Sequence, residues 1–560
     1  MFKGHPKGLF VAFFANMGER FGFYTMISIF VLFLQAKYGL NTAASSLVYG
    51  LFLFCVYFFP LLGGFLADKV LGYGKTISLG LVVMFLGYFL LALPSRMGMS
   101  FWLVIVALAT IALGTGFFKG NLQALVGNLY DDPRYSAMRD RAFNIFYMGI
   151  NIGAMFAPTA SEKVSNWILS KVNYVYDARI PALANDFLKN KLADASQYLD
   201  IARGQDPSVT LETLGQFSEK YINALSKSYH YGFGVACVAL VTSMLVFWGL
   251  RKYYKHADLT EKQKARSETL RSQVIELTPQ QTKERLIALG LVFLVVIFFW
   301  MSFHQSAVTM TYFARDYTVP NVGKVTNLWF DLFGLLPLFL AVVGLVFLLK
   351  KGSSSLTRLL GGIAFVAFAV LAVLRHRGYE NINPFTPQKF QHFNPFFIVA
   401  LTPVLVGLFG YWNKKGKEPS APRKIGIGML MTSVGFLLLV LASFGLPSPK
   451  ELGGRVAPPE FLVSTYWLIG TYFMLTIAEL FLSPMGISFV SRVAPPKLKG
   501  LMQGGWFAAT AIGNYLVSVI GYFWLKVPLW SLWMILVVCC LLSATFMFSV
   551  MKRLERAAQA

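Results

Sequence analysis

Long apolar segments separated by shorter polar ones run along almost the whole chain. An α-helix needs about 20 residues to cross the hydrocarbon layer of a bilayer. Fourteen segments meet this length, at 8–36, 46–66, 75–94, 100–127, 141–161, 230–250, 285–306, 328–349, 357–374, 394–412, 424–446, 461–490, 498–522 and 530–551. The pattern therefore predicts an all-α integral membrane protein that crosses the bilayer many times.

Two segments interrupt this pattern. Residues 162–229 are polar, and the spacing of Leu183 and Phe187 suits one face of an amphipathic helix, so we expect a small extracytoplasmic helical cap there. Residues 320–385 contain an extra apolar pair joined by the basic turn KKGSSSLTR, which predicts an inserted transmembrane hairpin. Twelve spans remain without it. They divide into two halves of six, an arrangement that places a substrate site between the halves near the midplane.

This division gives the expected order of parts along the chain. They are the first five spans (1–161), the cap (162–229), the sixth span (230–250), a cytoplasmic linker (251–284), the first span of the second half (285–319), the hairpin (320–385), the other five spans (386–551) and a cytoplasmic tail (552–560).

Composition and charge support the membrane assignment. Hydrophobic residues make up 56% of the chain and charged residues 14%, whereas soluble domains have about 25% charged residues. The chain has a net charge of +24, and the basic excess of the segments predicted to lie inside occurs in loops such as 251–285 and 413–424. This positive-inside pattern predicts cytoplasmic termini and explains the basic balance without a nucleic-acid partner. No catalytic motif such as HExxH or GxSxG is present, so we do not expect an enzyme.

Four ionisable residues lie deep inside apolar segments: Glu19, Arg20, Lys119 and Glu479. A charge near the centre of a membrane costs at least a few kcal/mol, so such residues are usually paired, exposed to a cavity, or functional. Two acids and two bases from distant spans predict one polar site inside the bundle. That is typical of a solute transporter, and a scaffold that had lost transport would have little reason to keep these charges.

A glycine-rich connection joins the second and third spans. It reads GGFLADKVLGYGKTISLG over residues 63–80, and its glycines and charges (Gly64, Asp68, Gly72 and Lys75) can cap helix ends and lock neighbouring spans together. This segment resembles the cytoplasmic-loop motif of the major facilitator superfamily.

Further motifs occur in the same order as in one family of that superfamily. They are ERFGFY at 19–24, GTGFFKGN at 114–121, FNIFYMGINIGAM at 143–155, FQHFNPFF at 390–397 and ELFLSPMG at 479–486. Together with the loop motif they resemble the proton-coupled oligopeptide transporter (POT) family. The resemblance covers nearly the whole chain except the cap and the hairpin, and it implies a major-facilitator-type bundle that transports peptides.

The resemblance also implies roles for residues in the spans. Arg20 and Lys119 would hold the carboxylate of a peptide, and Glu479 would face its amine or pair with Lys119 when the site is empty. The other substrate-binding residues implied are the amides Asn151 and Asn394, the hydroxyls Tyr24 and Tyr57, and the aromatic walls Trp300 and Trp506. Ordinary packing is an alternative for both tryptophans, helix–helix hydrogen bonding for Asn151, and a purely structural ion pair for Lys119 and Glu479.

The chain departs from the family pattern at three positions. Asn16 stands where the ExxER motif has its first glutamate, Ile27 where peptide transporters commonly have an arginine, and His304 where they have its acidic partner. Coupling to protons requires a group whose pKa depends on conformation. Glu19, Glu479 and His304 are the candidates.

We therefore predict a symporter that imports di- and tripeptides by alternating access, driven by protons. The alternative left open by the three departures is a transporter of another small anion or zwitterion (nitrate, an amino-acid conjugate or a modified peptide) with altered or lost proton coupling. We expect no cofactor and no metal, with the proton as coupling ion. The expected partners are the peptide, protons and the lipid bilayer, and the expected form is a monomer in the bacterial inner membrane.

Overall fold

Helices account for almost all of the described chain. The computed structural model describes residues 4–93, 101–132, 134–135, 138–192, 194–258, 278–495 and 498–559. Thirteen of its helices are long and apolar enough to cross a membrane. Helix α6 (Arg139–Ser170) has a more polar sequence and is not one of them, but it packs against α1 and α9 inside the bundle. With α6, a helix corresponds to each of the fourteen predicted spans, and the predicted all-α membrane fold is confirmed.

The first half of the bundle precedes the linker. It consists of α1 (Lys7–Tyr38), α2 (Thr42–Phe58) continued by α3 (Pro60–Leu66) and the π-helical turn η1 (Ala67–Leu71), α4 (Tyr73–Ala92), α5 (Phe101–Asn128), α6 and α9 (Leu214–Gly249). Short 3₁₀ turns, η3 (Arg251–Tyr253) and η4 (Lys255–Ala257), follow it. Glycines allow close helix packing here: a Cβ at Gly114 of α5 would lie 2.7 Å from the carbonyl oxygen of Gly80 in α4.

The second half repeats this six-span plan. It consists of α11 (Pro279–Phe303) continued by the 3₁₀ turn η6 (His304–Ala307) and α12 (Thr309–Asp316), then α16 (Phe393–Lys414) preceded by η7 (Pro387–His392), α17 (Ala421–Ala442), α18 (Tyr466–Val493) preceded by η8 (Pro459–Phe461), α19 (Lys499–Phe523) and α20 (Leu529–Ser549). A short helix, α21 (Met551–Gln559), ends the chain. The halves meet where α2 packs on α19 and α6 on α16. A Cβ at Gly50 of α2 would lie 3.1 Å from the carbonyl oxygen of Tyr515, so glycine permits this approach.

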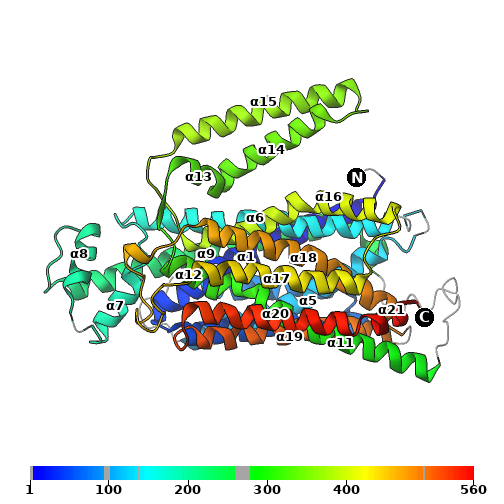
Figure 1. Ribbon diagram of the computed structural model, residues 1–560, viewed down its shortest axis with the longest axis horizontal. Helices are drawn as coiled ribbons and strands as arrows, with labels where there is room; N and C mark the ends of the chain where they lie inside the picture. Colours follow the sequence, from blue (N-terminus) through cyan, green and yellow to red (C-terminus); the bar gives the residue numbers. More distant parts are fainter. Residues whose placement is uncertain are drawn as a thin grey trace.

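The two ends of the bundle differ. Helices α7 (Ile180–Leu188) and α8 (Ser196–Gln205) lie at one end, and both chain termini lie at the other (Figure 1). We call these ends the cap side and the linker side. Helix α6 continues to Ser170 and α9 begins at Leu214, so both transmembrane helices extend into the segment 162–229 in which we expected the cap.

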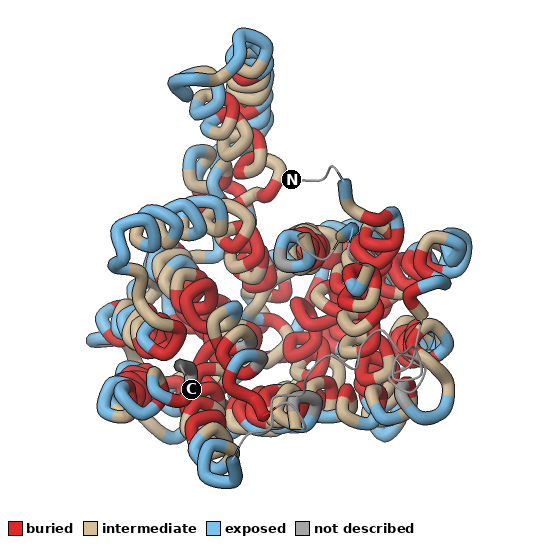
Figure 2. The backbone as a smooth tube through the Cα atoms, turned by 90° about the vertical axis from the view of Figure 1, so that its right-hand side faces the viewer, coloured by how far each residue is buried: buried red, intermediate tan, exposed pale blue. Residues whose placement is uncertain are grey.

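The inserted segment forms a hairpin that projects from the bundle (Figures 1 and 2). It contains α13 (Lys324–Phe330), α14 (Leu332–Leu349) and α15 (Ser355–Gly378), and its base is closed by pairing of β1 (Asn321–Val322) with β2 (Asn383–Pro384). Only Gly361 and Ala372 are buried in α15. The other apolar side chains of α15 are therefore available for contact with lipid.

Candidate functional site

A cavity of about 260 Å³ lies between the two halves at the centre of the bundle. Ten of the residues predicted for substrate binding or proton coupling line it: Arg20, Tyr24, Tyr57, Lys119, Asn151, Trp300, His304, Asn394, Glu479 and Trp506. They come from eight different spans. Glu19, the remaining predicted proton-coupling residue, does not line the cavity.

Arg20 shares its charge with its sequence neighbour. Its Nε and Nη2 donate to the two carboxylate oxygens of Glu19, each at 2.5 Å, and both side chains are almost completely buried. A guanidinium has five N–H groups, so donors remain on the cavity side for a ligand. The carboxylate of Glu19 thus compensates the buried arginine while the arginine still lines the cavity.

Lys119 is the second cation of the site. Its Nζ lies 3.7 Å from the ring centroid of Tyr57, a cation–π contact. Within the described residues it forms no ion pair, so the expectation that Glu479 pairs with Lys119 in the empty site is wrong for this structure. Their positive and negative charges remain available to a ligand.

Glu479 of α18 provides a negative charge from the second half of the bundle. Its carboxylate accepts hydrogen bonds from the hydroxyl of Tyr147 at 3.1 Å and from the amide of Asn394 at 2.9 Å. Both donors are neutral, so they orient the carboxylate without cancelling its charge. Tyr147 was missed in the sequence analysis. It lies one helical turn before Asn151, in the same motif, and that spacing could have indicated it.

The aromatic part of the site is built where the seventh span breaks. Helix α11 ends at Phe303, and His304 begins the 3₁₀ turn that leads to α12. The ring of His304 stacks on Trp300, with centroids 5.1 Å apart. Ile27 also lines the cavity. Two of the three positions that depart from the family pattern therefore face the same space.

Asn151 and Trp506 owe their positions to neighbouring glycines. The amide of Asn151 donates to the carbonyl of Tyr147 in its own helix at 3.0 Å, so it does not serve as a bond between helices. The close contact with α1 is made instead by Gly153, where a Cβ would collide with the carbonyl oxygen of Met17. Trp506 packs in the same way against Gly486, where a Cβ would overlap the indole ring.

The glycine-rich connection is stabilised in part by a residue outside the motif. Gly72 has φ +81° and ψ 162°, a conformation that favours glycine. The helix after it is capped by Asp258, whose carboxylate accepts from the N–H of Gly74 at 2.8 Å. Gly64 has open space around its Cα, Lys75 is exposed, and the side chain of Asp68 lies outside what the structure describes. Capping of helix ends by the motif's own charges therefore stays a prediction.

Polar contacts join the halves on the cap side of the cavity. Glu162 of α6 accepts a hydrogen bond from Thr386 at 2.8 Å and lies 3.5 Å from Lys389. The hydroxyls of Ser46 and Tyr312 lie 3.3 Å apart. On the same side, the guanidinium of Arg315 donates a hydrogen bond to the side-chain oxygen of Gln35. These contacts hold the two halves together on the cap side.

Comparison with known proteins is consistent with this architecture. The sequence profile described as the POT family (PTR2) matches residues 74–271 and 376–529. Dipeptide and tripeptide permease A of Yersinia pestis is 26% identical over 529 residues, covering 90% of this chain and 82% of the relative. The permease of the same name from Escherichia coli (strain K12) is 25% identical, covering 92% of this chain and 84% of the relative.

Solved structures share the fold. A crystal structure of peptide transporter POT in complex with sulfate aligns with a TM-score of 0.66 at 21% identity, covering 100% of this chain and 97% of that one. A POT family transporter in complex with 5-aminolevulinic acid aligns with a TM-score of 0.67 at 17% identity, covering 99% and 98%. Because the family profile matches more than half of the sequence, the chain belongs to the POT family of membrane transporters.

Proposed function

We propose that the protein is a proton-coupled symporter that imports di- and tripeptides by alternating access. The observation that carries the proposal is the pair of opposed charges in the central cavity. Lys119 and the free donors of Arg20 belong to the first half, and the carboxylate of Glu479 belongs to the second. A peptide zwitterion has a carboxylate at one end and an ammonium at the other, so it matches this arrangement. The names of the permease relatives support the same substrate class.

The peptide carboxylate would bind Arg20 and Lys119, and its ammonium would bind Glu479. Charge-assisted hydrogen bonds of this kind are about twice as strong as neutral ones. The amides of Asn151 and Asn394 and the hydroxyls of Tyr24 and Tyr57 would read the peptide backbone between the ends. Trp300 and Trp506 present broad apolar faces that accept side chains of different shapes.

Alternating access is supported by contacts on the cap side that a separation of the halves would break. On the cap side the halves are joined through Glu162, Thr386 and Lys389. The basic loops occur on the linker side, and the positive-inside rule then assigns the cap side to the exterior of a bacterial inner membrane. The form described here would be the inward-facing one, and separation of the cap-side contacts would open the outward-facing one.

Proton coupling would use Glu479, His304 or Glu19. In this form Glu479 accepts hydrogen bonds from Tyr147 and Asn394, and its surroundings would change when the halves move. His304 occupies a position in the cavity wall next to Trp300 and Tyr57. An unperturbed histidine titrates near pH 6.5, which suits a physiological switch. No cofactor besides the proton is proposed.

Uptake of labelled dialanine into proteoliposomes, with and without an inward proton gradient, tests the function. We expect accumulation that requires the gradient and that varied dipeptides compete. Uptake that ignores the gradient would contradict proton coupling and indicate that the replacement at Asn16 has uncoupled transport. Absence of dialanine uptake by folded protein would contradict peptide transport and favour another small anion or zwitterion.

A further inference from the structure

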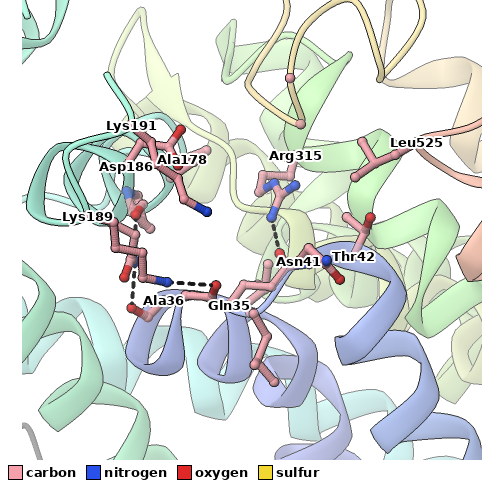
Figure 3. A pocket seen from close by; sticks show the side chains of 18 of the residues that line it. Gln35, Ala36, Asn41, Thr42, Ala178, Asp186, Lys189, Lys191, Arg315 and Leu525 are labelled. Carbon is pink, nitrogen blue, oxygen red and sulfur yellow. Dashed lines mark hydrogen bonds between the residues drawn. The ribbon is translucent and has the colours of Figure 1, made fainter. Parts of the chain in front are cut away.

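A second cavity of about 260 Å³ lies on the cap side, and no described residue lines both cavities. Its walls come from the end of α1, the start of α2, helix α7 of the cap, α12 and the loop at Gly453 and Gly454 (Figure 3). The cavity therefore lies where the two halves and the cap meet. Its volume is just below the range of about 300–1,000 Å³ of pockets for drug-sized molecules, which suits a smaller solute.

The lining of this cavity has an excess of positive charge. Arg315 is compensated by Asp316, to which it donates two hydrogen bonds at 2.6 and 2.8 Å. Lys189 donates to the carbonyl oxygen of Gly39 at 3.2 Å, which leaves its charge uncompensated. Lys191 forms no hydrogen bond or ion pair through its side chain within the described residues. The two lysines together make the cavity attractive to an anion.

Asp186 is the acid of this lining that has its own partner. Its carboxylate lies 3.4 Å from the guanidinium of Arg455. Because Arg455 offsets this negative charge, Asp186 does not cancel the charges of Lys189 and Lys191. Asp186 can also offer an acceptor at the edge of the cavity.

Two buried polar atoms of the lining lack a partner. They are Nε2 of Gln35 and Oγ1 of Thr42, neither of which has a hydrogen bond within the described structure. The Thr42 residue is only 5% exposed. Buried donors without an acceptor are unfavourable, and most such groups in proteins are satisfied by a partner, water or ligand. Both of these groups can donate, so a ligand with acceptor oxygens would satisfy them.

The cavity lies on the route by which a solute would enter from the cap side. Gln35 of α1 accepts a hydrogen bond from Arg315 of α12, so the contact joins the two halves at the cavity wall. Opening of the cap side requires these helices to separate. A solute that moves towards the central cavity between them would pass Lys189 and Lys191.

We propose that this cap-side cavity is a docking site for the carboxylate of an incoming peptide. Lys189 and Lys191 supply the charge, and Gln35 and Thr42 supply hydrogen-bond donors. The ligand class is a small carboxylate-bearing solute, and the transported peptide is its occupant. This inference rests on the proposed function, but it concerns a site separate from the central one.

Photolabelling separates the two sites in the intact protein. The probe is a dipeptide with a free carboxylate and a diazirine side chain, and mass spectrometry maps the labelled segments. We expect labels in the central spans and in residues 176–191. In the double variant Lys189→Gln/Lys191→Gln the label in 176–191 should fall about tenfold, the factor that corresponds to about 1.4 kcal/mol. The central label should remain, which also shows that this variant is folded.

Control variants and competitors sharpen the result. The exposed cap-side lysines of the variant Lys220→Gln/Lys227→Gln lie outside the cavity, so both labels should be unchanged. A probe whose C-terminal carboxylate is converted to an amide should not label residues 176–191. Excess dialanine should prevent labelling of these residues by the original probe. A label there that survives the amide or the Lys189→Gln/Lys191→Gln variant would overturn the docking site. So would a label that inorganic phosphate removes and dialanine does not.

The outcomes also distinguish this inference from the proposed function. A central label without one in 176–191 would overturn the docking site and leave peptide transport standing. Absence of the central label at a saturating probe concentration would contradict the proposed function itself.

Discussion

Replacement of Glu479 by glutamine tests the assignment of the peptide ammonium. Glutamine has nearly the same size and can still accept the hydrogen bond that the hydroxyl of Tyr147 donates at 3.1 Å. Glutamine has no charge, and the NH2 group that replaces the second carboxylate oxygen cannot accept the hydrogen bond from Asn394. The variant therefore removes the anionic wall of the cavity with little change in its shape.

The magnitude follows from the kind of interaction that is lost. Hydrogen bonds to charged groups contribute about 1.5–3 kcal/mol. At 1.4 kcal/mol for each factor of ten, the dissociation constant for dialanine should rise about 10- to 150-fold. N-acetyl-dialanine has no ammonium but keeps its carboxylate. Its dissociation constant should change by less than about threefold, because Arg20 and Lys119 are unaffected.

Equilibrium binding of both ligands to wild type and variant at one fixed pH gives the interaction energy directly. Glu460→Gln is a matched control, since Glu460 is an exposed acid outside the cavity. Thermal unfolding in detergent would show that each variant is folded. Equal losses of affinity for dialanine and N-acetyl-dialanine would refute the assignment of Glu479 to the ammonium.

Three other predictions concern stability and the closed cap side. Gly72→Ala should lower the free energy of unfolding by about 1–3 kcal/mol, because of the backbone strain at φ +81°. The control Gly64→Ala should leave the free energy of unfolding unchanged, because Gly64 lies in a helix with open space beside it. Equal unfolding curves for the two variants would contradict the strain at Gly72. Glu162→Gln removes the charge from the contact of Glu162 with Lys389, so spin-label distances between the halves on the cap side should increase. Unchanged distances would show that this contact does not hold the halves together. Glu418 lies between α16 and α17, and the hydrogen bond from Lys424 holds its pKa below the usual value of 4.5. This stabilisation is full above that pH and is lost as pH falls through the lower folded-state pKa, so Glu418→Gln should lower the melting temperature at pH 7 and progressively less on acidification. If the melting temperatures of wild type and Glu418→Gln differ by the same amount at every pH, ionisation of the carboxylate is not the cause of the difference.

The fold could be predicted from the sequence because the bilayer imposes a simple length rule on apolar segments. The sequence also predicted a span at 141–161, which lies within α6, the most polar of the spanning helices. The break of the seventh span at His304 was not predicted, since no proline or glycine marks it. The projection of α14 and α15 from the bundle was not predicted either. Both helices are apolar on all sides, so their sequence does not indicate which face packs.

The sequence predicted which residues form the site better than it predicted which of them form ion pairs. Charges inside apolar segments already indicated Arg20, Lys119 and Glu479 as members of one site. The family resemblance supplied the other lining residues, which come from spans too distant for any local pattern to connect. The pairing of Arg20 with Glu19 was unexpected, because adjacent residues on a helix do not face each other. Their long side chains nevertheless meet in the packed interior. The expected pair of Lys119 and Glu479 depended on a distance between two spans, which the sequence does not contain.

The most direct test of the central claim is an experimental structure of the protein with bound dialanine. We expect the peptide to lie in the central cavity, with its carboxylate on Arg20 and Lys119 and its ammonium on Glu479. The reverse orientation, or a peptide bound without contact to Glu479, would contradict it.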